Sequence, residues 1–191
     1  MKTQCVAIIS CCLMVSVTGG CQNKQGVKTS VNAVSEMATA AAKGDYLGGI
    51  IVGENYLRDN PGDTNVLEQT AILTLAQAKQ DPKNREVLVS RAVLLLERSV
   101  NSSGSEEDSA NRFENRFMAA RAFESAGDLS SDKCSHYGRA LSLNNEAATI
   151  VGVELFKLGD GKEISTKPLR EQSGKLQSEL EKRVSESRCG K

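Results

Sequence analysis

Cys134 and His136 are the residues that most suggest nucleophilic or metal chemistry. A thiol beside an imidazole can act as a nucleophile with its base, or both can bind zinc. The chain holds one His, and it lies two positions after Cys134 in a predicted helix. Helical side chains two positions apart point about 200° away from each other, so they cannot meet at one atom. We expect neither a catalytic residue nor a metal ligand here.

Two further patterns lack the features of the sites they resemble. The run Glu106-Glu107-Asp108 is acidic, but it has neither the alternating oxygen ligands nor the central Gly of a calcium loop. The glycine pairs at 19–20 and 48–49 have no preceding strand and no following Gly-Lys-Ser, which a phosphate-binding loop needs. We therefore expect no cofactor, no small-molecule substrate and no enzyme activity.

Composition narrows the class of partner. The chain has 191 residues, with 24 Lys plus Arg balanced by 24 Asp plus Glu and a formal net charge of zero. Nucleic-acid-binding domains usually carry a basic excess, so no nucleic-acid partner is expected. Only 4% of the residues are aromatic and none is Trp. Recurrent Ala and Leu instead predict small helices that pack on one another around one core.

Residues 1–20 have the pattern of a secretory signal peptide. Lys2 precedes an apolar run of residues 5–17, which is shorter than the roughly 20 residues that a membrane span needs, and small residues follow. Cleavage after Gly20 would leave Cys21 as the new N-terminus. The alternatives are an ordinary secreted protein, cut at the same place with a free Cys21 thiol, and an uncleaved anchor.

The Gly19-Gly20-Cys21 junction resembles the lipobox of bacterial lipoproteins, with Thr18 where that family prefers Leu. The resemblance implies acylation of Cys21, including palmitate, and anchoring without a spanning helix. Because Gln22 and not Asp follows, it also implies the outer membrane, facing the periplasm. Residues 21–30 are polar and would form a lipidated tether.

Only Cys134 and Cys189 would remain as thiols in the processed domain. In an oxidising compartment the two can pair and tie the C-terminal tail back to the domain. Two independent thiols are the alternative, and the sequence leaves both open.

Apolar residues at helical spacing predict an all-α domain over residues 31–161. Turn signals, such as Asn60-Pro61-Gly62-Asp63, separate the segments. Val93 and Leu94 widen the stripe of their helix, which should therefore be buried on more than one side. The predicted helices cover 31–43, 46–59, 64–80, 86–100, 109–128, 132–143 and 146–158.

Successive pairs of these predicted helices resemble the helical hairpins of the tetratricopeptide repeat family. The first unit has Gly44-Asp45-Tyr46 at the turn, Gly49 at the small packing position and Pro61 at the end of the repeat. The resemblance implies a right-handed solenoid of about three repeats. An irregular bundle of helical hairpins is the alternative. The other matches are Tyr56; Leu67, Ala71, Ala92 and Leu96; Ala119, Ala120, Phe123, Gly127 and Asp128; Tyr137, Ala140 and Leu143; and a half-repeat of Gly152, Leu155, Gly159 and Asp160.

Residues 162–191 form a charged segment with a thin apolar stripe, which predicts a helix that caps the array. A helix that binds a partner or phospholipids is the alternative. In the repeat family, the inward side of the first helix of each hairpin lines a peptide groove. The matching residues are Asn65, Glu68, Glu114, Phe117, Arg121 and Glu124. They are the candidate binding site, unless they are ordinary helix residues with Phe117 in the core.

Together these patterns predict a non-catalytic, lipid-anchored scaffold or assembly lipoprotein that docks another envelope protein. An immunity or inhibitor lipoprotein, which neutralises a toxin delivered into the periplasm, is the second hypothesis. An enzyme is the third, and it would need a cleft with paired acids of shifted pKa.

Overall fold

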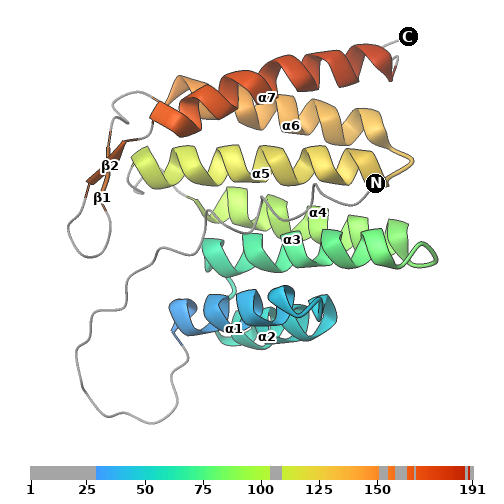
Figure 1. The fold of residues 1–191 in the computed structure, drawn as a ribbon, viewed down its shortest axis with the longest axis vertical. Helices are drawn as coiled ribbons and strands as arrows, with labels where there is room; N and C mark the ends of the chain where they lie inside the picture. The colour runs from blue at the N-terminus through green and yellow to red at the C-terminus, as the bar shows by residue number, and fades with distance from the viewer. Residues whose placement is uncertain are drawn as a thin grey trace.

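A computed structural model describes residues 29–103, 109–150, 155–157, 163–165, 167–187 and 189. The described residues form seven helices and one short pair of strands, so the predicted all-α class is confirmed. The helices stack along the long axis of the molecule in chain order, as Figure 1 shows. They are α1 (Ser30–Ala42), α2 (Tyr46–Asp59), α3 (Thr64–Gln80), α4 (Arg85–Ser102), α5 (Ser109–Leu129), α6 (Lys133–Thr149) and α7 (Lys167–Glu186).

Aspartates begin three of these helices, where backbone N–H groups would otherwise lack partners. The carboxylate of Asp45 accepts a hydrogen bond from Gly48 N at 2.9 Å, and Asp63 accepts one from Val66 N at 3.1 Å. Asp132 does the same for Ser135 N at the start of α6. Gly44 has a φ of +75°, which lets the chain turn sharply between α1 and α2.

The core runs through every helix of the stack. The predicted apolar faces of α3, α5 and α6 are buried, and α5 contributes three fully buried phenylalanines. Burying such a side chain contributes about 1.5–3 kcal/mol, so the row of hairpins is held mainly by apolar contact. The largest buried side chains are Phe113, Phe117, Phe123, Met37, Ile50, Leu67, Leu96, Leu143 and Leu180.

Small residues set the spacing between neighbouring helices. A Cβ added at Gly49 of α2 would meet Leu73 Cδ1 of α3 at 2.6 Å. A Cβ at Gly127 of α5 would collide with the ring of Tyr137 in α6. At both places the backbone of one helix lies directly against a side chain of the next.

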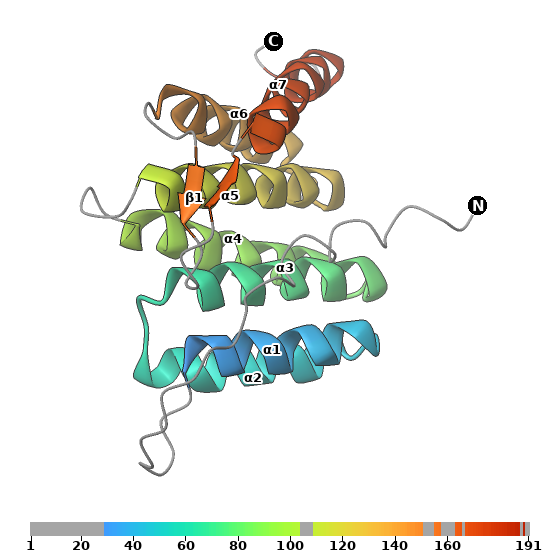
Figure 2. The same ribbon diagram turned by 60° about the vertical axis from the view of Figure 1, so that its left-hand side comes forward.

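The helices form two rows. The A row is α1, α3, α5 and α7, in which α3 packs directly on both α1 and α5. The B row is α2, α4 and α6, and each of its helices completes a hairpin with the A-row helix before it. Figure 2, turned from the first view, shows the hairpins stacked with α7 at the end of the array. The C-terminal helix therefore caps the stack, as predicted.

The prediction of a helix over residues 146–158 was wrong. Helix α6 continues through Asn144 to Thr149, because the buried Asn144 amide donates hydrogen bonds to α7, to Ser173 O at 3.1 Å and to Gln177 Oε1 at 3.0 Å. Ser173 Oγ donates to Asn144 Oδ1 at 2.8 Å. A side chain engaged in this way does not compete for the hydrogen bonds of its own helix.

Two short strands follow α6, where the sequence suggested a further half-repeat. The antiparallel pair β1 (Leu155–Lys157) and β2 (Glu163–Ser165) places Phe156 opposite Ile164. Leu155 therefore lies in a strand and not in a helix. The other half-repeat residues, Gly152, Gly159 and Asp160, are outside the described residues, as is the acidic run 106–108.

Candidate functional site

The six candidate groove residues lie on two adjacent helices of the A row. Asn65 and Glu68 are on α3, and Glu114, Phe117, Arg121 and Glu124 are on α5. Phe117 does not belong to a groove, because its side chain is 1% exposed and stacks on Phe113 with ring centroids 6.2 Å apart. It is part of the core, the alternative that the sequence left open for it.

Glu124 is used within the chain. Its carboxylate, in a residue that is 9% exposed, pairs with the guanidinium of Arg183 on α7 at 3.2 Å. Burial raises the pKa of Glu124, while the positive charge of Arg183 opposes that rise. Arg121 is half-buried, and its charge also lowers the pKa of Glu124. Glu124 thus secures α7 to α5 and is not free for a partner.

Arg183 is a structural residue that the sequence analysis did not identify. It also pairs with Asp128 of α5 and Glu179 of α7, and its guanidinium lies 5.7 Å from the ring centroid of Tyr137 in α6. One side chain therefore joins three helices. The charge pattern of residues 162–191 marked this segment as unusual, but it could not show which Arg meets which acid.

Glu68 is the least usual residue of the candidate site. Its side chain is 92% buried, with 8% exposed, and no hydrogen bond or ion pair joins it to any other described residue. Burial raises the pKa of its carboxyl to about 8, and the negative charge of Glu114 adds to that rise. A buried acid normally has a partner, because an ionised carboxylate loses its hydration inside a protein.

Glu114 lies on α5, the next helix of the A row, and its negative charge acts on Glu68. The residue is exposed overall, but protein atoms surround its carboxyl closely enough that burial raises its pKa as well. Asn65 is exposed and precedes Glu68 by one helical turn on the same face of α3. The Glu114 carboxylate of α5 thus raises the pKa of the Glu68 carboxyl of α3, where these helices pack.

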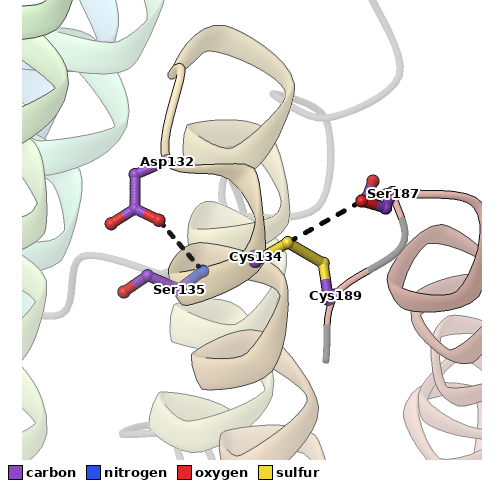
Figure 3. The surroundings of a disulfide bond; sticks show 5 residues. All are labelled: Asp132, Cys134, Ser135, Ser187 and Cys189. Atoms are coloured by element: carbon purple, nitrogen blue, oxygen red, sulfur yellow. Dashed lines mark hydrogen bonds between the residues drawn. A yellow bond between two sulfur atoms is a disulfide. The ribbon is translucent and has the colours of Figure 1, made fainter. Parts of the chain in front are cut away.

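The structure joins Cys134 and Cys189 in a disulfide, which settles the choice that the sequence left open. Their Cα atoms are 5.3 Å apart, inside the roughly 4.4–6.8 Å that a bridge requires. Figure 3 shows the bond between the first turn of α6 and the segment after α7, with Cys134 Sγ 4.0 Å from the Ser187 carbonyl oxygen. Cys134 thus has no free thiol that could react with His136.

Two surface hollows lie away from the acid pair. One, of about 640 Å³, lies between α6 and α7 and mixes Lys133, Lys182 and Arg183 with Glu179 and Glu186. The other, of about 540 Å³, lies along α6 around Leu141 and Glu146. Neither hollow is lined by Glu68 or Glu114.

Metal and membrane features were also sought in the described part of the chain. No group of three or more His, Cys, Asp or Glu side chains there is close enough to hold a metal ion. None of its helices is both long and apolar enough to cross a bilayer. The proposed lipidation site, Cys21, and the whole signal segment lie outside the described residues.

Comparison with known proteins provides no relative from which a role could be transferred. No protein-family model matches the chain, and no curated protein or solved structure matches it either. The functional assignment therefore depends on the residues and their geometry.

Proposed function

We propose that this protein is a non-catalytic docking lipoprotein of the bacterial cell envelope. Acylated Cys21 anchors it to the membrane, and its A row binds a partner protein at the α3–α5 junction. The outer membrane, facing the periplasm, is its proposed location.

 The observation that carries the docking proposal is Glu68, a buried acid that has no partner within the described chain.

Three features support an envelope location. The lipobox resemblance at Cys21 provides the anchor, and acyl chains hold a protein on a bilayer without a spanning helix. The Cys134–Cys189 disulfide is the kind of bond that persists in oxidising compartments such as the periplasm. The polar residues 21–30 are long enough to separate the helical array from the lipid.

The unpaired acid supports a binding role for the A row. An unpaired buried carboxylate reduces the stability of the free protein, and such groups are common where a protein meets its ligand. Other acids of the described chain, such as Glu97 and Glu124, have arginine partners within the fold. Glu68 and Glu114 are therefore the groups that binding could relieve.

Partner capture from detergent-solubilised envelopes tests the proposal. The full chain serves as bait beside Cys21→Ser and the double variant Glu68→Gln/Glu114→Gln. Val87→Ser/Leu94→Ser is the matched control, because both residues are exposed on the B row. Mass spectrometry then identifies the captured proteins and the modification at Cys21.

We expect an acylated Cys21 and a component of an envelope machine that the control retains and the double acid variant loses. A single toxin-like protein lost in the same way would instead favour the immunity hypothesis. An unacylated Cys21 together with no reproducible partner would refute the proposed function.

A further inference from the structure

Glu68 of α3 and Glu114 of α5 carry carboxyl groups where two helices of the A row pack on each other. Helices α3 and α5 pack directly on each other, and the two acids lie close enough that Glu114 raises the pKa of Glu68. Like charges brought together in this way repel each other unless a proton or a cation lies between them. The described part of the chain provides no such cation for Glu68.

The Glu68 carboxyl can be reached from outside although the residue is buried. Arg85 Nε is the fully enclosed side-chain polar atom that has no hydrogen bond in the described part of the chain. The Glu68 carboxyl oxygens also have no hydrogen bond, yet they are not enclosed in that way. The remaining 8% exposure of Glu68 therefore includes its acidic end, and an incoming group could touch it.

The neighbouring junction of the A row shows which chemistry fits such a pair. Where α5 meets α7, the guanidinium of Arg183 pairs with both Glu124 and Asp128. Arg183 stands in α7, the next helix of the row, and its single guanidinium serves both of these acids. At the α3–α5 junction the acids are present and the corresponding cation is absent among the described residues.

We infer that the Glu68–Glu114 pair binds a basic side chain, a Lys ammonium or an Arg guanidinium, from an exposed segment of the partner protein. The inference rests on the proposed docking function and names the chemistry of its partner. Two carboxyl groups fit one organic cation through charge-assisted hydrogen bonds. Calcium would require six to eight oxygen ligands, and the described residues offer no third acid at this place.

Binding of a cation should release a proton. Glu114 is the one charged group on α1, α2, α4 or α5, within their described residues, that acts on Glu68. With its pKa near 8, Glu68 is mostly protonated at neutral pH, and a cation favours the ionised form. Affinity for a basic side chain should therefore rise by roughly tenfold or more from pH 6.5 to pH 8.5.

Peptide titration of the full chain, in an uncharged detergent, tests the inference. The probes are acetylated and amidated Gly-Ser-Lys-Ser-Gly and Gly-Ser-Arg-Ser-Gly, with norleucine and citrulline versions as uncharged controls. Spermidine and magnesium chloride test a free amine and a metal ion. Carbon-13 NMR of labelled Glu carboxyl groups follows Glu68 directly, in the wild type and in Glu68→Gln, Glu114→Gln and the surface control Glu171→Gln.

We expect the Lys or Arg peptide to shift the Glu68 carboxyl resonance and to bind at least about tenfold more tightly than its uncharged version. Glu68→Gln and Glu114→Gln should each remove that preference, while Glu171→Gln keeps it. Equal binding of charged and uncharged peptides, or an unchanged preference in Glu68→Gln, would overturn the inference. Binding of spermidine or magnesium without binding of either basic peptide would overturn it as well.

The outcome is separable from that of the envelope capture. A captured partner that is lost in the double acid variant, together with no preference for basic peptides, would leave docking in place and reject the ligand chemistry. A clear peptide preference without acylation or a reproducible partner would reject the proposed envelope role and keep the cation site.

Discussion

Two junctions of the A row, α3–α5 and α5–α7, each contain two acidic side chains, but among the described residues only those at α5–α7 are paired with a cation. We call α5–α7 the closed junction and α3–α5 the open junction. At the α5–α7 junction Glu124 and Asp128 share the guanidinium of Arg183, and the Cys134–Cys189 disulfide secures the segment that follows α7. At the α3–α5 junction Glu68 and Glu114 have no such partner among the described residues. The comparison separates acids that hold the fold together from acids that remain available.

Several acids of the B row are paired with arginines, as the acids at the α5–α7 junction are. Arg91 of α4 pairs with Glu54 of α2, and Arg139 of α6 pairs with Glu97 of α4 at 2.8 Å. Arg91 and Arg139 are each the seventh residue of their helix, so successive hairpins repeat the same cross-link to the preceding B-row helix. Glu68 and Glu114 therefore differ from the B-row acids Glu54 and Glu97, which have arginine partners.

Removing the Cys134–Cys189 disulfide, which secures the segment after α7, should have the largest effect on stability. Cys134→Ser/Cys189→Ser removes a bond that spans 55 residues, and we expect a loss of about 2–4 kcal/mol in the free energy of unfolding. Urea denaturation followed by circular dichroism measures the loss. Reduced wild-type protein should match the double variant, and equal stability of the oxidised and reduced forms would contradict the prediction.

Replacing the Glu68 carboxyl with an uncharged amide should stabilise the protein. Glu68 has a native pKa near 8 against an ordinary value of 4.5, so between these values the native state binds more protons than the unfolded chain. Wild-type stability should therefore fall as pH rises from about 4.5 to 8. Glu68→Gln should remove this fall and gain on the order of 3 kcal/mol at neutral pH.

Denaturation of both proteins at pH 5 and pH 8 measures that gain. Glu171→Gln, an exposed acid on α7, is the control and should keep the wild-type dependence on pH. A wild type whose stability is the same at both pH values would show that Glu68 is not held in an unusual state.

Removing the Arg183 guanidinium should leave the acids of the α5–α7 junction without their cation. Arg183→Met leaves Glu124 buried without a counter-charge, and we expect a loss of about 2 kcal/mol. Lys182→Met is the control, because the Lys182–Glu186 pair is exposed and should contribute well under 1 kcal/mol. Similar losses in the two variants, by urea denaturation, would argue against a special role for Arg183.

Placing a cation of the chain's own beside Glu68 should have the smallest effect on stability. Asn65→Arg places a guanidinium one turn before Glu68, where it should lower the pKa of Glu68 and change stability by less than about 1 kcal/mol. The same variant should compete with the Lys peptide for the acid pair. Carbon-13 NMR measures both effects, with Asn65→Gln as the neutral control that should leave the pKa and the peptide binding unchanged.

The sequence predicted the helices well because the apolar spacing and the turn residues agree with each other. Asn60-Pro61-Gly62 follows the end of α2 and Asp63 begins α3, and the buried faces of α3 and α5 follow the expected period. It failed at Asn144, where a bond to α7 overrides the local preference of asparagine. It also failed at Leu94, expected to be buried but 66% exposed, because no helix covers that side of α4 in the described array.

The candidate site was predicted only in part, because pairing depends on packing. Family spacing puts Glu68, Glu114 and Glu124 on first helices of the hairpins, and they do lie in the A row. Nothing in that spacing separates Glu124, which meets Arg183, from Glu68, which meets no cation among the described residues. The partner of Glu124 lies 59 residues away along the chain, counted from 124 to 183. Only the packing of α7 on α5 and α6 brings the two together.

The Cys134–Cys189 bond also makes the last part of the chain a covalent ring. A protease that cuts the backbone once, anywhere between the two cysteines, produces two fragments that the sulfur bridge still holds together. The capping helix α7 lies inside this ring and would stay attached to α6 after such a cut. Cleavage alone would then leave the end of the array covered, and release of α7 would require a reductant as well.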